Sequence, residues 1–226
     1  MTEKTACLII HGFGGNVGEV GTLRDYLSDK GFFVVCSTLK GHTGIKRDMA
    51  GVHYSEWINS AEKDLICLIP RFERVIVIGF SMGGLIAANL ALKHRVSGIA
   101  TLSAPIYYWD IKRIFANIIN NLKTRNYVNI QYYTKSAFTI PLSALINFRV
   151  LLYRSKPIFR QITCPIFVAQ GMMDDTVQHR SAEYIFNSAA SSVKRKKYYQ
   201  NANHLICHSS DKEALFEDIF RFINQV

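Results

Sequence analysis

The chain has little that would support a disulfide framework or a metal site. Its 226 residues include five cysteines, an odd number, and no two of them form a CxxC pair. They are Cys7, Cys36, Cys67, Cys164 and Cys207. Most of them fall in or beside apolar runs, which favours reduced thiols in a core, and no spacing typical of metal ligands is present. We therefore expect no metal and no cofactor.

A long apolar run is also lacking, and no leader is expected. No apolar run approaches the ~18 residues of a membrane span. Within a few residues of Met1 the chain enters an apolar, strand-like run, whereas an export leader would place a charged segment before its apolar one. We therefore expect a cytoplasmic protein. The length fits a single domain over residues 1–226 that can bury a sizeable core.

Among the features that are present, the pentapeptide Gly-Phe-Ser-Met-Gly at residues 79–83 is the most informative. The apolar run 75–78 directly precedes it, and a helical pattern, residues 85–92, follows. A GxSxG sequence between a strand and a helix is typical of a nucleophile elbow, because small residues allow the sharp turn that exposes the serine Oγ. In another setting Ser81 would be an ordinary helix N-cap. The flanking patterns favour Ser81 as a nucleophile.

A nucleophilic serine needs a base, and the base needs an orienting acid. In hydrolases built on this elbow, the acid and then the histidine follow the serine along the chain. The apolar run 166–169 leads into a loop that carries two adjacent carboxylates, Asp174 and Asp175. We choose Asp174 as the acid and keep Asp175 as its competitor. The alternative for either residue is a turn or a helix N-cap.

Seven histidines compete for the role of base. Four precede the acid, and His179 follows it with no strand between. His204 lies on a loop after the last predicted strand, so it completes the order of serine, acid and histidine. His208 is interpreted as a surface residue near a helix start. His204 is therefore the candidate base.

A glycine-rich loop follows the first apolar run and reads His-Gly-Phe-Gly-Gly over residues 11–15. Such a loop can approach a ligand with bare backbone. We assign the donors of an oxyanion hole to the backbone N–H groups of Phe13 and Met82, the second being the residue after the nucleophile. A phosphate-binding loop is the alternative, but the segment has neither a GxGxxG sequence nor the lysine of a P-loop.

These motifs, with residues 40–42, 171–174 and 203–204, resemble those of the α/β-hydrolase superfamily. Within it the chain is most similar to the small bacterial carboxylesterases that include the monoacylglycerol lipases. The resemblance covers nearly the whole chain and is weakest between about residues 106 and 160. It implies a serine esterase with a covalent acyl-enzyme. The family often has glycine where this chain has Thr43 and Asn203.

Strand and helix patterns alternate along the chain, which predicts an α/β fold with a mostly parallel sheet and helices on both faces. Strands are predicted near residues 6–11, 32–38, 74–79, 96–103, 164–170 and 195–199. Helices are predicted near residues 19–30, 54–69, 82–93, 179–188 and 211–224. Four consecutive cations at residues 194–197 overlap the last predicted strand and indicate an edge strand.

Residues 105–160 interrupt this alternation between the fourth and fifth predicted strands. Apolar residues recur there at helical spacing. They are Ile111, Ile114, Phe115, Ile118, Ile119 and Leu122. We interpret the insertion as a helical lid over Ser81 that shapes the substrate pocket, with simple shielding of the core as the alternative. The candidate pocket residues are Ile106, Tyr107, Trp109 and Met172.

The basic character of the chain is concentrated in the same insertion. Residues 105–160 hold nine lysines and arginines against the single acid Asp110, which is +8 of the formal +10. Cations interleaved with aromatic residues are typical of surfaces that meet anionic lipid, acidic substrates or nucleic acid. We favour a solvated charged face over an aromatic core, with transient contact to an anionic membrane as the second interpretation. Nucleic acid is not expected, since no motif for it is present.

The sequence thus predicts a serine carboxylesterase that hydrolyses short- to medium-chain carboxylic esters or monoacylglycerols through an acyl-serine intermediate. The partner expected is a small-molecule ester, and the protein is expected to be a monomer. The alternatives are an acyltransferase or thioesterase with the same triad, or a non-catalytic binding protein on the hydrolase scaffold.

Overall fold

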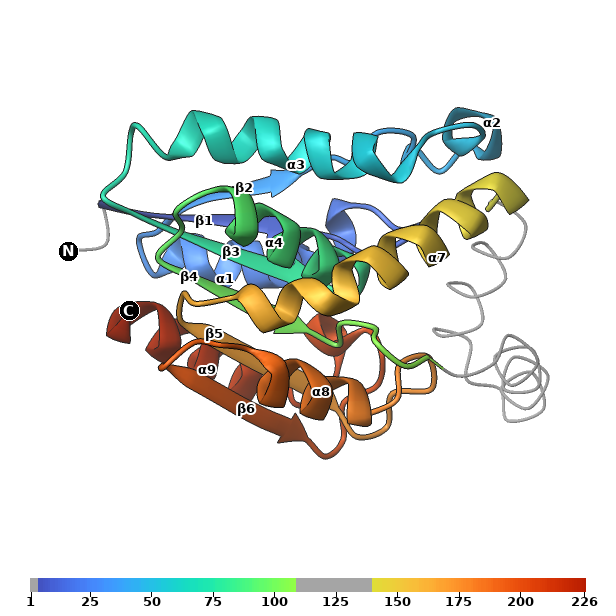
Figure 1. Ribbon diagram of the computed structural model, residues 1–226. Coiled ribbons are helices and arrows are strands. Elements are labelled where there is room, and N and C mark those ends of the chain that lie inside the picture. The colour runs from blue at the N-terminus through green and yellow to red at the C-terminus, as the bar shows by residue number, and fades with distance from the viewer. Residues whose placement is uncertain (1–3, 109–139) are drawn as a thin grey trace.

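A parallel six-stranded sheet forms the centre of the computed structural model, which describes residues 4–108 and 140–226 (Figure 1). Its strand order is β2-β1-β3-β4-β5-β6, and every neighbouring pair is parallel. The strands are β1 (Thr5–Ile10), β2 (Phe33–Ser37), β3 (Arg74–Phe80), β4 (Gly98–Leu102), β5 (Ile166–Gly171) and β6 (Lys194–Tyr199). The predicted mostly parallel sheet is confirmed.

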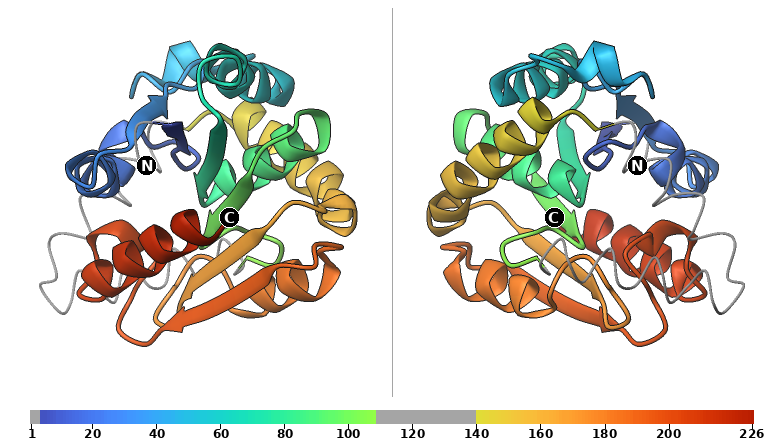
Figure 2. Two further views of the ribbon diagram at one scale, coloured as in Figure 1. Left: turned by 90° about the vertical axis from the view of Figure 1, so that its left-hand side faces the viewer. Right: turned by 90° about the vertical axis from the view of Figure 1, so that its right-hand side faces the viewer.

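Helices cover both faces of this sheet (Figure 2). One face packs against α3 (Tyr54–Leu68), α4 (Met82–Lys93), α7 (Leu142–Ser155) and α8 (Arg180–Ser188). The other face packs against α1 (Gly21–Asp29) and α9 (Lys212–Gln225). Shorter helical segments are α2 (Lys46–Met49) and the 3-10 turns η2 (Val17–Val20), η3 (Lys156–Gln161) and η4 (Ile206–His208).

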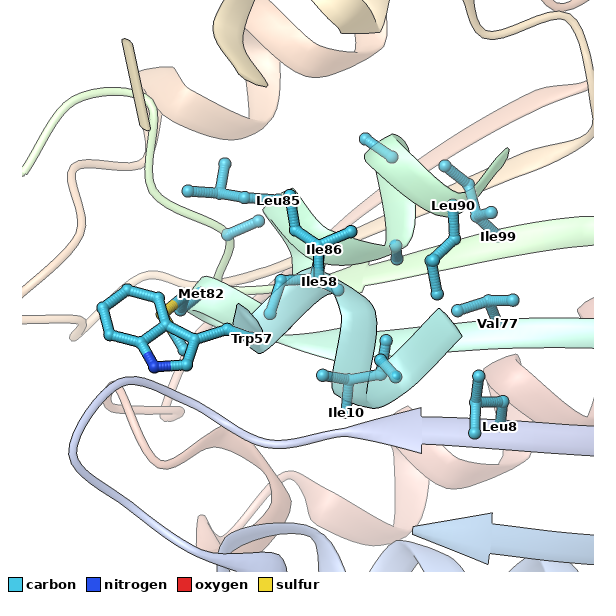
Figure 3. Packing of buried hydrophobic residues seen from close by; sticks show 14 of the residues in the cluster. Leu8, Ile10, Trp57, Ile58, Val77, Met82, Leu85, Ile86, Leu90 and Ile99 are labelled. Atoms are coloured by element: carbon cyan, nitrogen blue, oxygen red, sulfur yellow. The ribbon is translucent and has the colours of Figure 1, made fainter. Parts of the chain in front are cut away.

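The inner strands are mostly apolar because they are buried on both faces. All six residues of β1 are buried, and alternate side chains enter different cores. Leu8 and Ile10 belong to the core beneath α3 and α4, whereas Ile9 belongs to the core beneath α1 and α9. Figure 3 shows the first of these cores, where Trp57 of α3 lies beside Met82 of α4. A run without polar alternation is what a parallel sheet covered on both faces requires.

Strand β6 lies at the edge of the sheet, as its four cations indicate. Lys196 lies with its Nζ 5.2 Å from the ring centroid of Phe186 in α8. On the other face, Lys197 forms a 2.6 Å ion pair with Asp218 of α9. The strand therefore keeps its cations in contact with flanking helices while it leaves one side of its backbone unpaired within the sheet.

The structure differs from the sequence-based expectation in local details. The helix predicted near 19–30 divides into η2 and α1, and the short elements α2 and η4 were not predicted. Within the 105–160 insertion, α7 and η3 are helical as expected. Trp109 and the apolar stripe from Ile111 to Leu122 lie outside the described residues.

Candidate active site

Ser81 stands at the turn between β3 and α4, at the carboxyl end of the sheet. Its backbone has φ 50° and ψ −119°, a conformation that residues with a side chain rarely adopt. Holding a residue other than glycine there costs about 1–3 kcal/mol, and such strain is concentrated at functional sites. The structure therefore forms the sharp elbow that the GxSxG sequence predicts.

Glycines around the elbow make close backbone contacts that leave no space for a side chain. A Cβ atom at Gly79 would lie 2.2 Å from the carbonyl oxygen of Gly83. A Cβ atom at Gly83 would lie 2.2 Å from the carbonyl oxygen of Ile10, at the end of β1. The start of α4 therefore packs directly against the end of β1 and the start of the glycine-rich loop, so Ser81 and residues 11–15 lie at one site.

The structure brings the three predicted residues together. Ser81 Oγ lies 3.2 Å from Nε2 of His204, and Nδ1 of His204 lies 3.0 and 3.1 Å from the two carboxylate oxygens of Asp174. All three side chains are buried. A carboxylate only accepts hydrogen bonds, so Nδ1 carries the donating proton and Nε2 presents its lone pair to the serine hydroxyl. This geometry suits removal of a proton from Ser81.

Between the two adjacent carboxylates, the geometry favours Asp174. Its Oδ1 accepts hydrogen bonds from the N–H groups of Thr176 (2.9 Å) and Val177 (2.7 Å), and its Oδ2 accepts one from Nε2 of Gln170 (2.9 Å). Asp175 instead accepts a 3.2 Å bond from the Thr176 hydroxyl. Only Asp174 therefore combines a fixed carboxylate with direct contact to the histidine.

The electrostatic environment of His204 favours its protonated form. Burial lowers the pKa of His204, but the charge and hydrogen bond of Asp174 raise it, with smaller contributions from Asp175 and Glu19, and the net pKa is raised above 6.5. An imidazolium formed during proton transfer is therefore stabilised where it would arise.

The oxyanion hole is predicted to use two backbone N–H groups, those of Phe13 and Met82. No acceptor among the described residues pairs with the N–H of Phe13 or of Met82. Nδ1 of His11 donates a 2.9 Å hydrogen bond to the carbonyl of Gly12. That carbonyl and the Phe13 N–H belong to one trans peptide and point in opposite directions, so this bond fixes where the N–H points.

His11 acts here as a neutral side chain. Burial lowers its pKa to about 4, opposed by the bond to the Gly12 carbonyl. Its second nitrogen, Nε2, lies 3.5 Å from the N–H of Leu39, which suits a ring that donates through Nδ1 and accepts through Nε2.

The proposed pocket residues have different surroundings. Ile106 is buried in the core, and Met172 is 38% exposed just after β5. The ring of Tyr107 lies between Arg180 (4.2 Å to the centroid) and Lys156 (4.4 Å). Tyr107 thus belongs to a cation-lined contact with α8 and η3. Trp109 lies outside the described residues.

Sequence reasoning missed three side chains that support the site. Phe148 of α7 stacks on the ring of Phe13 at 4.9 Å, so the 105–160 insertion does reach the glycine-rich loop of residues 11–15. Gln170 holds Asp174, and Glu19 accepts a 2.9 Å bond from the N–H of Gly12. The only sequence signal for Gln170 is a polar residue at the end of an apolar strand just before the acid, and Glu19 has no comparable signal.

The described residues provide neither a metal cluster nor a membrane-spanning helix. Among residues 4–108 and 140–226, no group of three or more His, Cys, Asp or Glu residues is placed to hold a metal ion. No helix in the same described ranges has both the length and the apolar character to cross a membrane.

Comparison with curated proteins gives relatives along almost the whole chain. The chain is 22% identical over 230 residues to a carboxylesterase of Bacillus subtilis (strain 168), which covers 98% of this chain and 93% of that protein. It is 24% identical over 226 residues to the thermostable monoacylglycerol lipase of Bacillus sp. (strain H-257), covering 95% and 88%. The resemblance to esterases and monoacylglycerol lipases is confirmed.

Solved structures share the fold. A structure of the metagenome-derived lipolytic enzymes LipS and LipT has a TM-score of 0.83 at 20% identity, covering 100% of this chain and 96% of that one. A soluble variant of monoglyceride lipase from Saccharomyces cerevisiae, bound to a substrate analogue, has a TM-score of 0.76 at 18% identity, covering 98% and 86%. The family described as serine aminopeptidase, S33, matches residues 2–211. With this fold and this match, the chain belongs to the serine aminopeptidase S33 family of α/β-hydrolases.

Proposed function

We propose that the protein is a serine carboxylesterase. The observation that carries the proposal is the continuous contact from Ser81 Oγ through the His204 ring to Asp174. The left-handed backbone of Ser81 supports it, and so do the N–H groups of Phe13 and Met82, which pair with no acceptor in residues 4–108 and 140–226. The family description names a peptidase, but the relatives named carboxylesterase and monoacylglycerol lipase support an ester substrate.

In the proposed mechanism, His204 Nε2 removes the proton of Ser81 as Oγ forms a bond to the ester carbonyl carbon. The resulting oxyanion accepts hydrogen bonds from the Phe13 and Met82 N–H groups. His204 then gives the proton to the leaving alcohol as the carbon–oxygen bond breaks. Water activated by the same ring attacks the acyl-serine, which releases the carboxylic acid and restores Ser81. Asp174 orients the ring and stabilises its charged form.

The substrate proposed is an uncharged ester of short to medium acyl chain or a monoacylglycerol. The ring of Phe148 stacks on Phe13 and lies with its centroid 6.4 Å from that of Tyr108, which supports an apolar wall beside the oxyanion loop. Because an apolar pocket separates neighbouring chain lengths by only about 1–3 kcal/mol per methylene, we expect activity on several acyl lengths.

The experiment is hydrolysis of p-nitrophenyl esters from acetate to palmitate, with a monoacylglycerol in parallel, by the wild type and the variants Ser81→Ala and His204→Ala. Turnover that peaks at short to medium chains in the wild type and is lost in both variants supports the proposal. Absence of turnover by the folded wild type contradicts it. Activity on thioesters alone, or acyl transfer to an added alcohol without hydrolysis, would favour the thioesterase or acyltransferase alternative.

We further propose transient contact with anionic membrane through the basic insertion. Its described part, residues 105–108 and 140–160, has four cations and no acid: Arg149, Arg154, Lys156 and Arg160. On α7, the side chains of Leu142, Ile146 and Tyr153 are 73%, 55% and 81% exposed, and their spacing puts them on one helix face. An exposed apolar stripe beside arginines is typical of a helix that lies in a lipid interface.

Vesicle co-sedimentation tests this contact. We expect binding to vesicles that contain phosphatidylserine, weaker binding to phosphatidylcholine vesicles, and release as salt rises. Binding that is equal on both lipids and indifferent to salt would contradict the electrostatic part. The cytoplasmic location and monomeric state stay predictions, and size-exclusion chromatography with light scattering tests the second.

A further inference from the structure

Glu19 is a buried carboxylate that the proposed mechanism does not use. It lies in η2, and only 7% of its surface is exposed. Its Oε2 accepts a 2.9 Å hydrogen bond from the N–H of Gly12, in the glycine-rich loop. Burying a carboxylate costs free energy unless its charge is paired or hydrogen-bonded. A buried carboxylate at this place is therefore expected to have a specific role.

The glycine-rich loop is folded closely around this carboxyl group. A Cβ atom at Gly15 would lie 2.1 Å from Oε1 of Glu19, so any side chain at that position would displace the carboxylate from where it lies. The backbone of Glu19 is itself fixed, since its N–H bonds to the carbonyl of Asn16 at 3.1 Å. The side-chain oxygen of Asn16 accepts a further bond from Gly18 at 2.8 Å. A short, rigid turn therefore delivers the carboxylate to the loop.

The same turn is joined to the segment that follows His204. The ring of His208 donates from Nε2 to the carbonyl of Gly18 at 3.0 Å. The hydroxyl of Thr22, at the start of α1, donates to the carbonyl of Cys207 at 2.8 Å. Glu19 thus stands where the segments carrying Phe13 and His204 meet.

The backbone rotation of Gly12 has the largest influence on the direction of the Phe13 N–H. Glycine has the least restricted backbone, so the peptide that follows it is free to rotate unless it is held. His11 holds the carbonyl of Gly12, and Glu19 holds its N–H. Together these two bonds fix the peptides on both sides of Gly12.

We propose that Glu19 is a positioning residue that, by binding the Gly12 N–H, keeps the Phe13 N–H directed at the oxyanion of the transition state. The inference rests on the proposed esterase function and deepens it. A hydrogen bond to an ionised acceptor is stronger than one to a neutral acceptor, which explains a carboxylate rather than an amide at this position.

The charge of Glu19 has a second consequence. The carboxylates that act on His204 are Asp174, Asp175 and Glu19, and all three raise its pKa. Removing only the charge of Glu19 should therefore shift the acid limb of the pH–rate profile to lower pH. This shift reports the charge of Glu19 at His204, whereas kcat and the affinity for a transition-state analogue report the position of the Phe13 N–H.

The test compares Glu19→Ala, Glu19→Gln and the exposed control Glu213→Gln in full-length protein. The assays are kcat and KM on p-nitrophenyl butyrate and the inhibition constant of an alkyl boronic acid, which binds a serine as a tetrahedral adduct. For Glu19→Ala we expect kcat to fall about 100-fold with KM changed by less than about 3-fold, as for loss of an oxyanion donor. The boronic acid inhibition constant should rise by a similar factor. Glu19→Gln, which keeps an acceptor, should lose about 10-fold and shift the acid limb.

The outcomes are separable. An inactive wild type contradicts the esterase proposal itself. An active wild type with Glu19→Gln unchanged in kcat, boronic acid affinity and acid limb contradicts the positioning role alone. The same holds if either Glu19 variant raises KM without lowering kcat. If Glu19→Ala does not fold, Glu19→Gln still decides, because the amide has the same shape.

Discussion

The two halves of the candidate site are held in place in different ways. On the serine side, backbone shape fixes the reactive group: Gly79 and Gly83 pack where no Cβ fits, and Ser81 takes a left-handed conformation. On the other side, hydrogen bonds fix the reactive groups, since Asp174 is held by two backbone N–H groups and the amide of Gln170. Close backbone packing requires glycines that are recognisable as a local sequence motif, whereas hydrogen bonds between distant residues produce no such motif.

The largest effect on kcat is expected from replacing one carboxylate oxygen of Asp174 by nitrogen, with the same change at Asp175 as the comparison. Asp174→Asn puts an amide against Nδ1 of His204 and favours the wrong ring tautomer, so we expect kcat to fall about 10,000-fold. Asp175→Asn is the matched control and should change kcat by less than about 10-fold. Steady-state hydrolysis of p-nitrophenyl butyrate measures both. Equal losses of kcat in the two variants would contradict the choice of Asp174 over Asp175 as the partner of His204.

On the serine side, a single added methyl group should disrupt the close backbone packing at Gly83. Gly83→Ala places a Cβ atom against the Ile10 carbonyl, and we expect it to lower the free energy of unfolding by more than about 3 kcal/mol. Gly21→Ala is the control, because nothing lies within 4 Å of its added Cβ and its φ of −60° suits alanine. That variant should be neutral or more stable by up to about 1 kcal/mol. Chemical denaturation compares them, and a mild Gly83→Ala would remove the steric account.

Loss of one bond on the acid side should have a smaller effect. Gln170→Leu removes the donor to Oδ2 of Asp174 while the two backbone donors to Oδ1 remain, so we expect kcat to fall about 10-fold. Gln178→Leu is the control, since its amide donates to the carbonyl of Tyr108 instead. Both are assayed beside circular dichroism to verify folding. A Gln170→Leu enzyme with full activity would show that the backbone donors suffice.

The smallest effects are expected in the pH dependence of activity and of stability, which report on different buried histidines. His42 is buried with its ring centroid 5.1 Å from that of His11. Burial lowers the pKa of both histidines to about 4, while Asp174 holds the pKa of His204 above its ordinary 6.5. A base must be neutral, so kcat/KM should fall as pH falls through a value above 6.5. His11 and His42 bind protons more readily when unfolded, so the stability that their neutral forms give should be lost as pH falls from about 6.5 to 4.

Two measurements check these signs. A pH–rate profile gives the acid limb, and thermal unfolding at pH 4.5 and 7 gives the stability change. An acid limb below 6.5 would contradict the assigned environment of His204. A melting temperature that is higher at pH 4.5 than at 7 would contradict the neutral state assigned to His11 and His42.

The difference between the halves also sets how far the sequence predicts the site. Five of the six parallel strands followed from apolar runs and β6 from a short basic run, and Ser81 followed from glycines that no other residue can replace. The sequence favoured Asp174 but left Asp175 as a competitor, because the bonds that distinguish them depend on three-dimensional placement. Glu19 was missed for the same reason: its partner Gly12 is seven residues away and the bond uses the backbone, which has no sequence signature.

Labelling with a fluorophosphonate, read by intact mass and peptide mapping, tests the central claim most directly. The wild type should take up one adduct on Ser81, Ser81→Ala should take up none, and His204→Ala should react far more slowly. An unlabelled wild type that is folded, or a label that persists in Ser81→Ala, would contradict the assignment of Ser81 as the nucleophile.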